Sequence, residues 1–348
     1  MLNNVALFTE PKSINLQTID IPKIKESEIL VKTAYCGLCG TDIHLYDGKV
    51  PFANYPLVPG HEFSGEIIKV GSKVKNDLKI GDRVAINPNL SCYDLQKKLC
   101  YYCEKNRKHF CVAWEAIGVT LNGAFAEYVI CPSTVAYKIP DNVSLKAAAF
   151  MEPLACCLHG LNNMTIMDSD VVFIIGCGPI GLLMLSVIKA TTSCKVIVSE
   201  PVNSRRNLAR KIGADVILNP LSDEIVPIIN SETCDKGVDV AIECVGLSNT
   251  AKQAIGSLNK GGKALIFGVA DPLSTIDLDI HRLYSNEISI FGSFTNPNTN
   301  MRALDLLSKD ILTPIPIISH EFPIKRIEEA ISLIKSHVDN VNKILINP

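Results

Sequence analysis

Three residues of the kinds that bind zinc lie near one another in the N-terminal part of the chain. Cys39 stands in the run Gly-Leu-Cys-Gly-Thr-Asp-Ile-His, and His61 and Glu62 follow in Gly-His-Glu. A thiolate, an imidazole and a carboxylate are ligands that a tetrahedral zinc ion accepts. Three protein ligands leave one coordination position for water or substrate, which distinguishes a catalytic zinc from a structural one. These residues therefore predict a catalytic zinc site.

Further polar side chains extend the predicted chemistry. Glu152, in Met-Glu-Pro-Leu, stands at the predicted junction of two domains, where a cleft would form. The sequence leaves open whether Glu62 or Glu152 completes the zinc shell, directly or through water. Zinc polarises an alcohol oxygen and lowers the pKa of its proton, so that a hydride can leave the carbon. Thr41 and His44 predict a relay that carries the proton to solvent, and an exposed turn histidine is the alternative for His44.

A second group of cysteines predicts another zinc site. Four of them fall within twenty residues and include a Cys-x2-Cys pair, which is typical of a closed site with four thiolates. A disulfide-bonded lobe is the alternative. The predicted ligands of this structural zinc are Cys92, Cys100, Cys103 and Cys111.

A glycine-rich turn farther along the chain predicts a dinucleotide site. An apolar, mostly β-branched run at 171–175 leads into Gly-Cys-Gly-Pro-Ile-Gly, and an apolar helix follows at 180–190. The first glycine allows a sharp bend, the second lets the backbone approach a pyrophosphate at the helix N-terminus, and the third allows close packing. A strand, turn and helix without a ligand is the alternative. The predicted contact residues are Gly176, Gly178, Pro179, Ile180 and Gly181.

Glu200 bears on which dinucleotide binds. It follows the second strand, 195–199, and lies 19 residues after Gly181. An acid at this place accepts hydrogen bonds from the ribose hydroxyls of NAD and repels the 2′-phosphate of NADP. Arg205 and Arg206 keep NADP open as an alternative, because an arginine could meet that phosphate. The sequence thus favours NAD.

Two kinds of structure must position these residues. Up to about residue 150, short alternating or β-branched runs are broken by Gly and Pro, which predicts a mostly antiparallel β-domain, a barrel or a sandwich. Beyond it, strand-like and helical stretches alternate, which predicts a parallel sheet with crossover helices. The strand-like runs are 171–175, 196–199, 238–242, 264–269 and 288–291, with helices such as 180–190 and 203–212. The last part predicts a helix at 300–309, a strand at 311–318 and a helix at 324–336.

Composition narrows the class of protein. With 348 residues, 47% hydrophobic and 20% charged, the chain is long enough for two globular domains. A formal net charge of −2 and the lack of a basic patch argue against a nucleic-acid partner. The uncharged run 171–188 is broken by glycines and a proline, so it predicts a buried strand and helix and no membrane span. Thirteen cysteines and an N-terminus unlike a signal peptide predict a cytoplasmic location.

Together these motifs resemble those of the medium-chain zinc-dependent alcohol dehydrogenase family, in the same order and along essentially the whole chain. The resemblance implies an α/β protein with two domains. Residues 1–151 and 294–348 would form a GroES-like, mostly antiparallel β-domain that carries out catalysis. Residues 152–293 would form a Rossmann domain, a doubly wound parallel sheet that binds NAD.

The resemblance also implies the site residues. Cys39, His61 and either Glu62 or Glu152 match the shell of the catalytic zinc in this family. The proton relay of the family matches Thr41 and His44, and its second, structural zinc matches the four cysteines named above. The NAD site adds to the glycine-rich turn the following residues: Glu200, Arg205, Phe267, Gly268, Val269, Phe294 and Thr295.

Within the family, Met-Glu-Pro-Leu around Glu152 resembles the sorbitol and polyol dehydrogenase branch. The chain departs from that branch at Leu45 and at Thr295-Asn296, where animal-type sorbitol dehydrogenases have an aromatic residue and an Arg-Tyr pair that hold the polyol. It also departs at Cys92, which seven residues separate from Cys100, whereas the usual gap is two residues. If Cys92 is a zinc ligand, the intervening loop must bulge outward.

These observations lead to one predicted function. The chain is expected to be a zinc-dependent oxidoreductase that transfers a hydride from a secondary alcohol of a sugar alcohol, or of its phosphate, to NAD and gives a ketose. A threonine-type enzyme and a dehydrogenase of short secondary alcohols are the alternative enzymes. A nucleotide-binding redox sensor is the alternative without catalysis. The resemblance further implies a homo-oligomer, a dimer or a tetramer.

Overall fold

The computed structural model describes residues 1–74, 77–336, 338 and 340–348. The chain forms two compact units. Met1–Ala155 and Thr295–Pro348 make up the first, and Cys156–Phe294 make up the second. Both chain ends therefore belong to the same unit, and the second unit is an insertion between them.

The first unit contains a mostly antiparallel sheet. Its strands are β3 (Glu28–Leu38), β4 (Glu62–Val70), β5 (Arg83–Ile86), β8 (Tyr128–Pro132), β9 (Ala136–Lys138), β16 (Ile318–Pro323) and β17 (Lys343–Asn347). Among the described residues their order is β16-β17-β3-β4-β5-β9, with β8 also paired to β3, and β16–β17 is the one parallel pair. The predicted antiparallel β-domain is thus confirmed, and the C-terminal strand β17 lies inside its sheet.

Smaller elements complete the first unit. The strands are the hairpin β1 (Leu2–Glu10) and β2 (Ser13–Asp20) and the short pair β6 (Asn89–Leu90) and β7 (Glu115–Ala116). The helices are α1 (Gly40–Tyr46), α2 (Tyr101–Glu104), α3 (Leu145–Ala148), α10 (Asn300–Ser308) and α11 (Ile327–Lys335), with α4 (Met151–Asn162) beginning here. The 3-10 turns are η1 (Lys108–Phe110), η2 (Ser133–Val135), η3 (Ile315–Ile317) and η4 (Ile324–Arg326).

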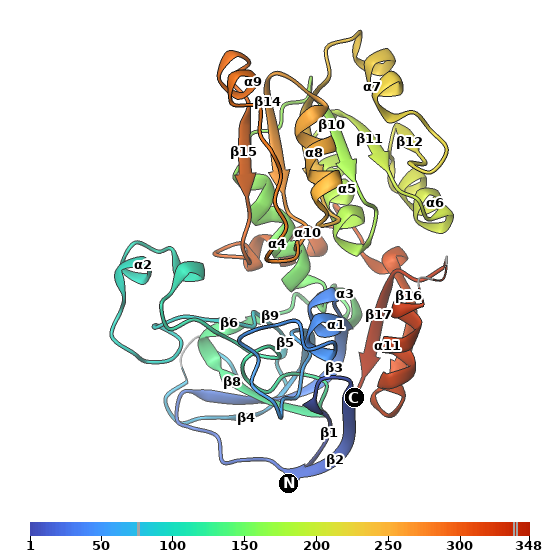
Figure 1. Cartoon of the computed structure of the whole chain (residues 1–348). Helices are drawn as coiled ribbons and strands as arrows, with labels where there is room; N and C mark the ends of the chain where they lie inside the picture. Colours follow the sequence, from blue (N-terminus) through green and yellow to red (C-terminus); the bar gives the residue numbers. More distant parts are fainter. Residues whose placement is uncertain (75–76, 337, 339) are drawn as a thin grey trace. The chain divides into compact units, whose positions relative to one another are not determined.

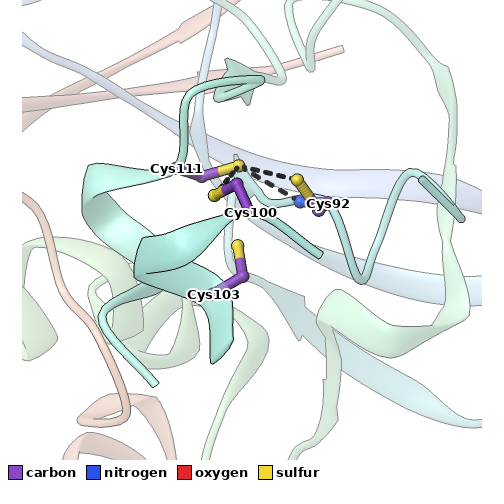
Figure 2. A group of neighbouring side chains, drawn as sticks. All are labelled: Cys92, Cys100, Cys103 and Cys111. Carbon is purple, nitrogen blue, oxygen red and sulfur yellow. Dashed lines mark hydrogen bonds between the residues drawn. The ribbon is translucent and has the colours of Figure 1, made fainter. Parts of the chain in front are cut away.

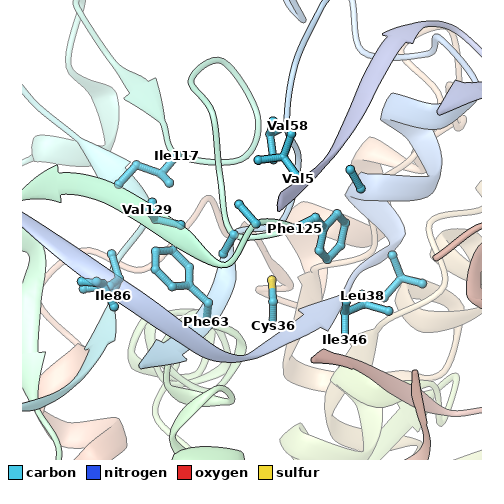
Figure 3. Close-up of a cluster of buried hydrophobic side chains, with 14 of the residues drawn as sticks. Val5, Cys36, Leu38, Val58, Phe63, Ile86, Ile117, Phe125, Val129 and Ile346 are labelled. Carbon is cyan, nitrogen blue, oxygen red and sulfur yellow. The ribbon is translucent and has the colours of Figure 1, made fainter. Parts of the chain in front are cut away.

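The core of the first unit is built by strands from both ends of the chain. Figure 3 shows Cys36 and Leu38 of β3, Phe63 of β4 and Ile346 of β17 gathered around Phe125. Each is at most 3% exposed. Burying a large apolar side chain contributes about 1.5–3 kcal/mol, so this cluster holds the N-terminal and C-terminal segments together.

The second unit is a parallel sheet with crossover helices (Figure 1). Its strands are β10 (Val171–Ile175), β11 (Lys195–Ser199), β12 (Val216–Leu218), β13 (Val238–Glu243), β14 (Leu258–Ile266) and β15 (Ser289–Gly292). Its helices are α5 (Pro179–Thr191), α6 (Asn203–Ile212), α7 (Ile225–Thr233), α8 (Ser248–Gly256) and α9 (Ile280–Ser285). In the described part of the unit the strand order is β12-β11-β10-β13-β14-β15, the doubly wound order of dinucleotide-binding folds. The predicted parallel sheet is confirmed.

One predicted element is wrong. The strand expected at 311–318 does not form, and β16 begins only at Ile318. Pro314 and Pro316 explain the difference, because a proline has no N–H to donate to a neighbouring strand and its φ is fixed. The segment instead contains the 3-10 turn Ile315–Ile317.

Across the described residues no helix has the length and apolar character needed to cross a bilayer.

Candidate metal and dinucleotide sites

Cys39, His61 and Glu62 come together in the first unit. One ligand atom from each lies within 4.8 Å of the other two, and His61 and Glu62 are buried. Cys39 precedes helix α1 as its N-cap, and Glu62 begins β4. Because the last residues of β3 pair with the first residues of β4, and Gly37 lies opposite Glu62, the sheet places the two ligand-bearing segments side by side. The donor set suits a zinc ion with one coordination position left open.

Asp42 orders this cluster, although sequence reasoning gave it no role. Its side chain is completely buried and accepts hydrogen bonds from the amides of Cys39 (2.8 Å) and Gly60 (3.3 Å). Its Oδ1 also lies 3.5 Å from Nδ1 of His61. Contact at Nδ1 leaves Nε2 of that ring for a metal, which is the usual arrangement of a carboxylate behind a metal-binding histidine. An acid three residues after a helix N-cap is the local signal that could have found it.

The electrostatic surroundings of His61 favour a cation. Burial by itself would lower the pKa of His61, but Asp42 and Cys39 outweigh that effect and raise the pKa well above its usual value. Asp42 and Cys39 therefore stabilise positive charge at His61.

Lys343 is a second residue that sequence reasoning missed. Its ammonium forms an ion pair with Glu62, and both side chains are about 95% buried or more. Burial would lower the pKa of Lys343, yet Glu62 and Cys39 raise it, so the ammonium stays charged. A Cβ on Gly37 would lie only 2.1 Å from Oε2 of Glu62 and 2.8 Å from Cε of Lys343, so a larger residue there would displace the ion pair. The local signal that could have found it is a single lysine at the start of an otherwise apolar C-terminal strand.

Of the other predicted site residues, Thr41 contacts this cluster directly. The Sγ atom of Cys39 contacts Oγ1 of Thr41 at 3.8 Å, and His44 follows three residues later on the same face of α1. Glu152 is not part of the group whose ligand atoms lie within 4.8 Å of one another. Instead its Oε1 accepts a hydrogen bond of 3.3 Å from Nδ2 of the completely buried Asn296. Of the two acids that the sequence left open, Glu62 is thus the one beside Cys39 and His61.

The four cysteines predicted to bind a structural zinc also come together (Figure 2). We call the segment 92–111 the cysteine lobe. The Sγ atom of Cys111 lies 3.4 Å from that of Cys92 and 4.0 Å from that of Cys100. Four sulfurs at about 2.3 Å from a tetrahedral zinc are about 3.8 Å apart, so the spacing fits the ion. Residues 93–99 form the excursion that lets Cys92 join.

The thiols of the cysteine lobe differ in acidity. Amides of Val112 and Cys103 donate to Cys100 and lower its pKa to about 6. Burial raises the pKa of Cys111 to about 12. A thiolate is thus favoured at Cys100, whereas burial opposes one at Cys111. A dication is the partner that lets all four ionise.

We expect Cys92→Ser to lower the metal content of the protein from two zinc ions per chain to one. The remaining three thiols leave one vertex of the tetrahedron without sulfur, so the melting temperature should fall while turnover falls less than on loss of the catalytic zinc. Metal analysis and thermal unfolding test this. Cys234→Ser, which changes an exposed thiol outside the lobe, is the control. One zinc per chain in fully active wild-type protein would contradict the two-zinc hypothesis.

The glycine-rich turn of the second unit has the form expected of a dinucleotide site. Gly176 has φ +89°, a conformation that favours glycine, and a Cβ on Gly181 would lie 1.9 Å from the carbonyl oxygen of Gly176. Gly178 is the N-cap of α5, with Pro179 as its first residue. Among the described residues, no atom lies within 4 Å of the place where a Cβ on Gly178 would be. The turn therefore leaves room for a phosphate at the start of a helix.

Glu200 is nearly buried beside this turn. Its Oε2 accepts a hydrogen bond from the amide of Cys177 (2.6 Å), and its Oε1 accepts one from Val202 (2.9 Å). The guanidinium of Arg206 donates to the backbone oxygens of Glu200 (2.8 Å) and Pro201 (2.6 Å). The two amides fix the Glu200 carboxylate at the carboxyl end of β11. The bonds to the backbone oxygens give Arg206 a structural role that needs no phosphate.

Glu243 organises the opposite side of the turn, and sequence reasoning missed it. Its Oε1 accepts hydrogen bonds from the amides of Val245 (2.7 Å) and Gly246 (2.8 Å), and its backbone oxygen accepts from Phe267 and Gly268. The predicted residues Phe267 and Gly268 are thereby held at the carboxyl ends of the strands, while Val269 is 77% exposed. In open parallel sheets this edge is where ligands bind.

Comparison with known proteins shows the family of the chain. Residues 25–141 match the family model of the alcohol dehydrogenase GroES-like domain, and residues 179–309 match that of zinc-binding dehydrogenases. The D-arabitol-phosphate dehydrogenase of Enterococcus avium is 31% identical over 90% of this chain and 88% of its own. The sorbitol dehydrogenase of Bombyx mori is 31% identical over 96% of both chains. Among solved structures, a zinc-binding dehydrogenase of Sinorhizobium meliloti 1021 bound to NADP is 32% identical over the whole of both chains, with a TM-score of 0.93.

Proposed function

Since the chain belongs to the family of zinc-dependent alcohol dehydrogenases, we propose that it oxidises a secondary alcohol of a sugar alcohol, or of a sugar-alcohol phosphate, to a ketose with NAD. The observation that carries the proposal is the cluster of Cys39, His61 and Glu62, whose three ligand atoms would leave a bound zinc one position for the substrate. The first unit would supply the metal site and the second the dinucleotide site. The catalytic domain would comprise residues 1–151 and 294–348, and the dinucleotide-binding domain residues 152–293.

A polar cavity in the first unit, which Cys39, His61 and Glu62 do not line, has a lining that suits a polyhydroxylated molecule. Amide and hydroxyl side chains line it: Asn87, Asn89, Ser91, Thr134, Tyr137 and Asn296. Such groups both donate and accept hydrogen bonds, as the hydroxyls of a polyol require. Lys108 also lines the cavity and would suit a phosphate on the substrate.

The roles of the chain's own residues follow from their places. Cys39, His61 and Glu62 would hold the zinc, and Asp42 would keep the imidazole oriented. Bound zinc supplies a Lewis acid that lowers the pKa of the alcohol proton, and bound NAD supplies the acceptor of the hydride. Thr41 would accept the alcohol proton through its hydroxyl and pass it to His44, whose imidazole can release it to solvent. Glu152, held by Asn296, would orient the substrate.

The experiment that tests this function is the reduction of NAD against a panel of polyols, polyol phosphates, short secondary alcohols and L-threonine. We expect NADH to form with at least one polyol or polyol phosphate. Turnover of L-threonine or a simple alcohol without any polyol would replace the proposed substrate class. Absence of turnover with the whole panel, in zinc-loaded protein, would favour the redox-sensor alternative.

We expect the wild-type enzyme to prefer NAD over NADP by at least about 100-fold in kcat/KM, because an uncompensated like-charge contact costs several kcal/mol. Glu200 is the residue that would make this contact. Glu200→Gln keeps the size of the side chain but replaces one of the two oxygens that accept backbone amides, so it should narrow the preference and also lower the melting temperature. Kinetics with both cofactors measure the effect. Wild-type preference for NADP would mean that Arg205 and Arg206 govern the site.

We further propose that the chain is a homo-oligomer, a dimer or a tetramer, in the cytoplasm, with a polyol as its small-molecule partner. The edge strand β15 supports self-association, because unpaired strand edges favour pairing and nearby apolar side chains are exposed: Leu273, Tyr284 and Ile290 at 89%, 82% and 36%. The thirteen cysteines, all described, are free thiols, which supports a reducing compartment.

A further inference from the structure

A path of hydrogen-bonded side chains crosses the first unit. The indole Nε1–H of Trp114 donates to Oδ1 of Asn89 (3.1 Å), Nδ2 of Asn89 donates to Oδ1 of Asn296 (3.0 Å), and Nδ2 of Asn296 donates to Oε1 of Glu152 (3.3 Å). Asn296 is completely buried and Glu152 is 9% exposed. We call these four side chains the amide relay.

The amide relay has a fixed direction. An indole nitrogen can only donate a hydrogen bond, and a carboxylate can only accept one. With Trp114 at one end and Glu152 at the other, each of the two amides must turn its oxygen toward Trp114 and its nitrogen toward Glu152. A flip of either amide would bring two donors or two acceptors together, which costs the full desolvation of the groups left unpaired.

The Trp114 end of the relay is held by the cysteine lobe. The amide of Trp114 donates to the backbone oxygen of Cys111 (3.1 Å), so the two residues share one turn. Asn89 lies in β6, three residues before Cys92, and Trp114 directly precedes β7. Pairing of β6 with β7 closes the base of the lobe. The lobe's cysteines and the first two relay residues therefore move as one body.

We propose that Asn89 and Asn296 are positioning residues through which the metal state of the cysteine lobe sets the orientation of the Glu152 carboxylate. A closed lobe fixes Trp114, and the directional path then fixes the amide that faces Glu152. Loss of the lobe's metal would free the side chain of Cys111 at this turn, and the amide of Asn296 would then hold the Glu152 carboxylate less firmly. The inference rests on the proposed function for the role of Glu152 at the site, but the relay itself can be measured without substrate.

The first measurement uses the single tryptophan of the chain, whose indole N–H gives one NMR resonance. The sample is the zinc-loaded full-length protein without dinucleotide or polyol, because Trp114, Asn89 and Asn296 also line the polar cavity. We expect Asn296→Ala to shift this resonance, since Asn89 loses its acceptor. In an Asn89→Ala background the same substitution should leave the resonance unchanged. If Asn296→Ala leaves the chemical shift of the indole N–H unchanged in the otherwise wild-type protein, the relay is refuted.

The second measurement is a double-mutant cycle in turnover of the best substrate. Trp114→Phe removes only the indole donor and keeps a ring beside Phe52, which the indole contacts edge-on. We expect it to lower kcat about fivefold, without change in the KM for NAD. Asn296→Ala should lower kcat about 10-fold, the effect of losing one hydrogen bond to a carboxylate. Adding Trp114→Phe to Asn296→Ala should then change nothing further.

Controls separate the relay from general damage. Tyr93→Phe removes a polar atom from an exposed aromatic of the same lobe, outside the relay, and should leave kcat and the indole resonance near their wild-type values. If the fold-loss in kcat of the double variant equals the product of the losses of Trp114→Phe and Asn296→Ala, the proposal is contradicted. Two residues on one path are not expected to act independently. A protein that shows the expected indole shifts but oxidises no polyol would contradict the proposed function and support the relay.

Discussion

Cys39→Ser is expected to abolish alcohol oxidation and to leave NADH binding intact. Cys39 lies within 4.8 Å of His61 and Glu62, and it is the one thiolate in that group. A serine hydroxyl is not a thiolate, so the variant should lose the zinc that lowers the pKa of the alcohol. The glycine-rich turn belongs to the other compact unit, which the substitution does not touch.

Three measurements check this result together. Turnover should fall to background, metal analysis should give one zinc fewer per chain, and fluorescence titration should give an unchanged affinity for NADH. Cys234→Ser, at an exposed thiol, is the matched control and should match the wild type in all three. A Cys39→Ser protein that lacks this zinc and still turns over at a substantial fraction of the wild-type rate would refute the catalytic role of the metal.

Lys343→Met is expected to cause the largest loss of stability. Removing one partner of a buried ion pair leaves the other charge uncompensated, at a cost of about 3–5 kcal/mol in the free energy of unfolding. Glu62 is that partner, and the structure gives it a buried place between Gly37 and Lys343. Zinc would also neutralise Glu62, so the loss should be larger in metal-free protein than in zinc-loaded protein.

Denaturant unfolding with and without a zinc chelator measures both values. Lys146→Met is the matched control, because Lys146 pairs with Glu321 at 2.6 Å but both side chains are about one-third exposed. Such pairs contribute about 0–1 kcal/mol. Equal losses in the free energy of unfolding for Lys343→Met and Lys146→Met would show that the buried Glu62–Lys343 pair contributes no more to stability than an exposed pair. A loss that is independent of zinc would show that Glu62 is not a ligand.

The parts of the fold that the sequence predicted are those with a local signal. The alternation of strands and helices around 171–292 gave the parallel sheet, since each crossover carries its own periodicity. The hairpin β1–β2 and the short helix α1 went unpredicted, because β2 is mostly exposed and lacks the alternation of a half-buried strand, and α1 has only seven residues. The strand predicted at 311–318 was wrong because two prolines interrupt an otherwise strand-like run of isoleucines.

The candidate sites divide in the same way. By itself the sequence determined the chemical kinds and local spacing of the ligands: Cys39 before its helix, His61 next to Glu62, the Cys-x2-Cys pair, and the glycines at 176–181. These features are read from neighbours along the chain, because a turn or a helix cap is made by residues a few positions apart.

Only the tertiary structure decided which distant residues serve the ligands. Lys343 reaches Glu62 because β17 pairs with β3 on the side opposite β4, so that Gly37 has Leu345 on one side and Glu62 on the other. Asn296 reaches Glu152 across 144 residues of sequence, and Asn89 reaches Asn296 across 207. No spacing along the chain encodes such contacts, because strand order and burial, and not sequence distance, determine which polar groups must satisfy one another.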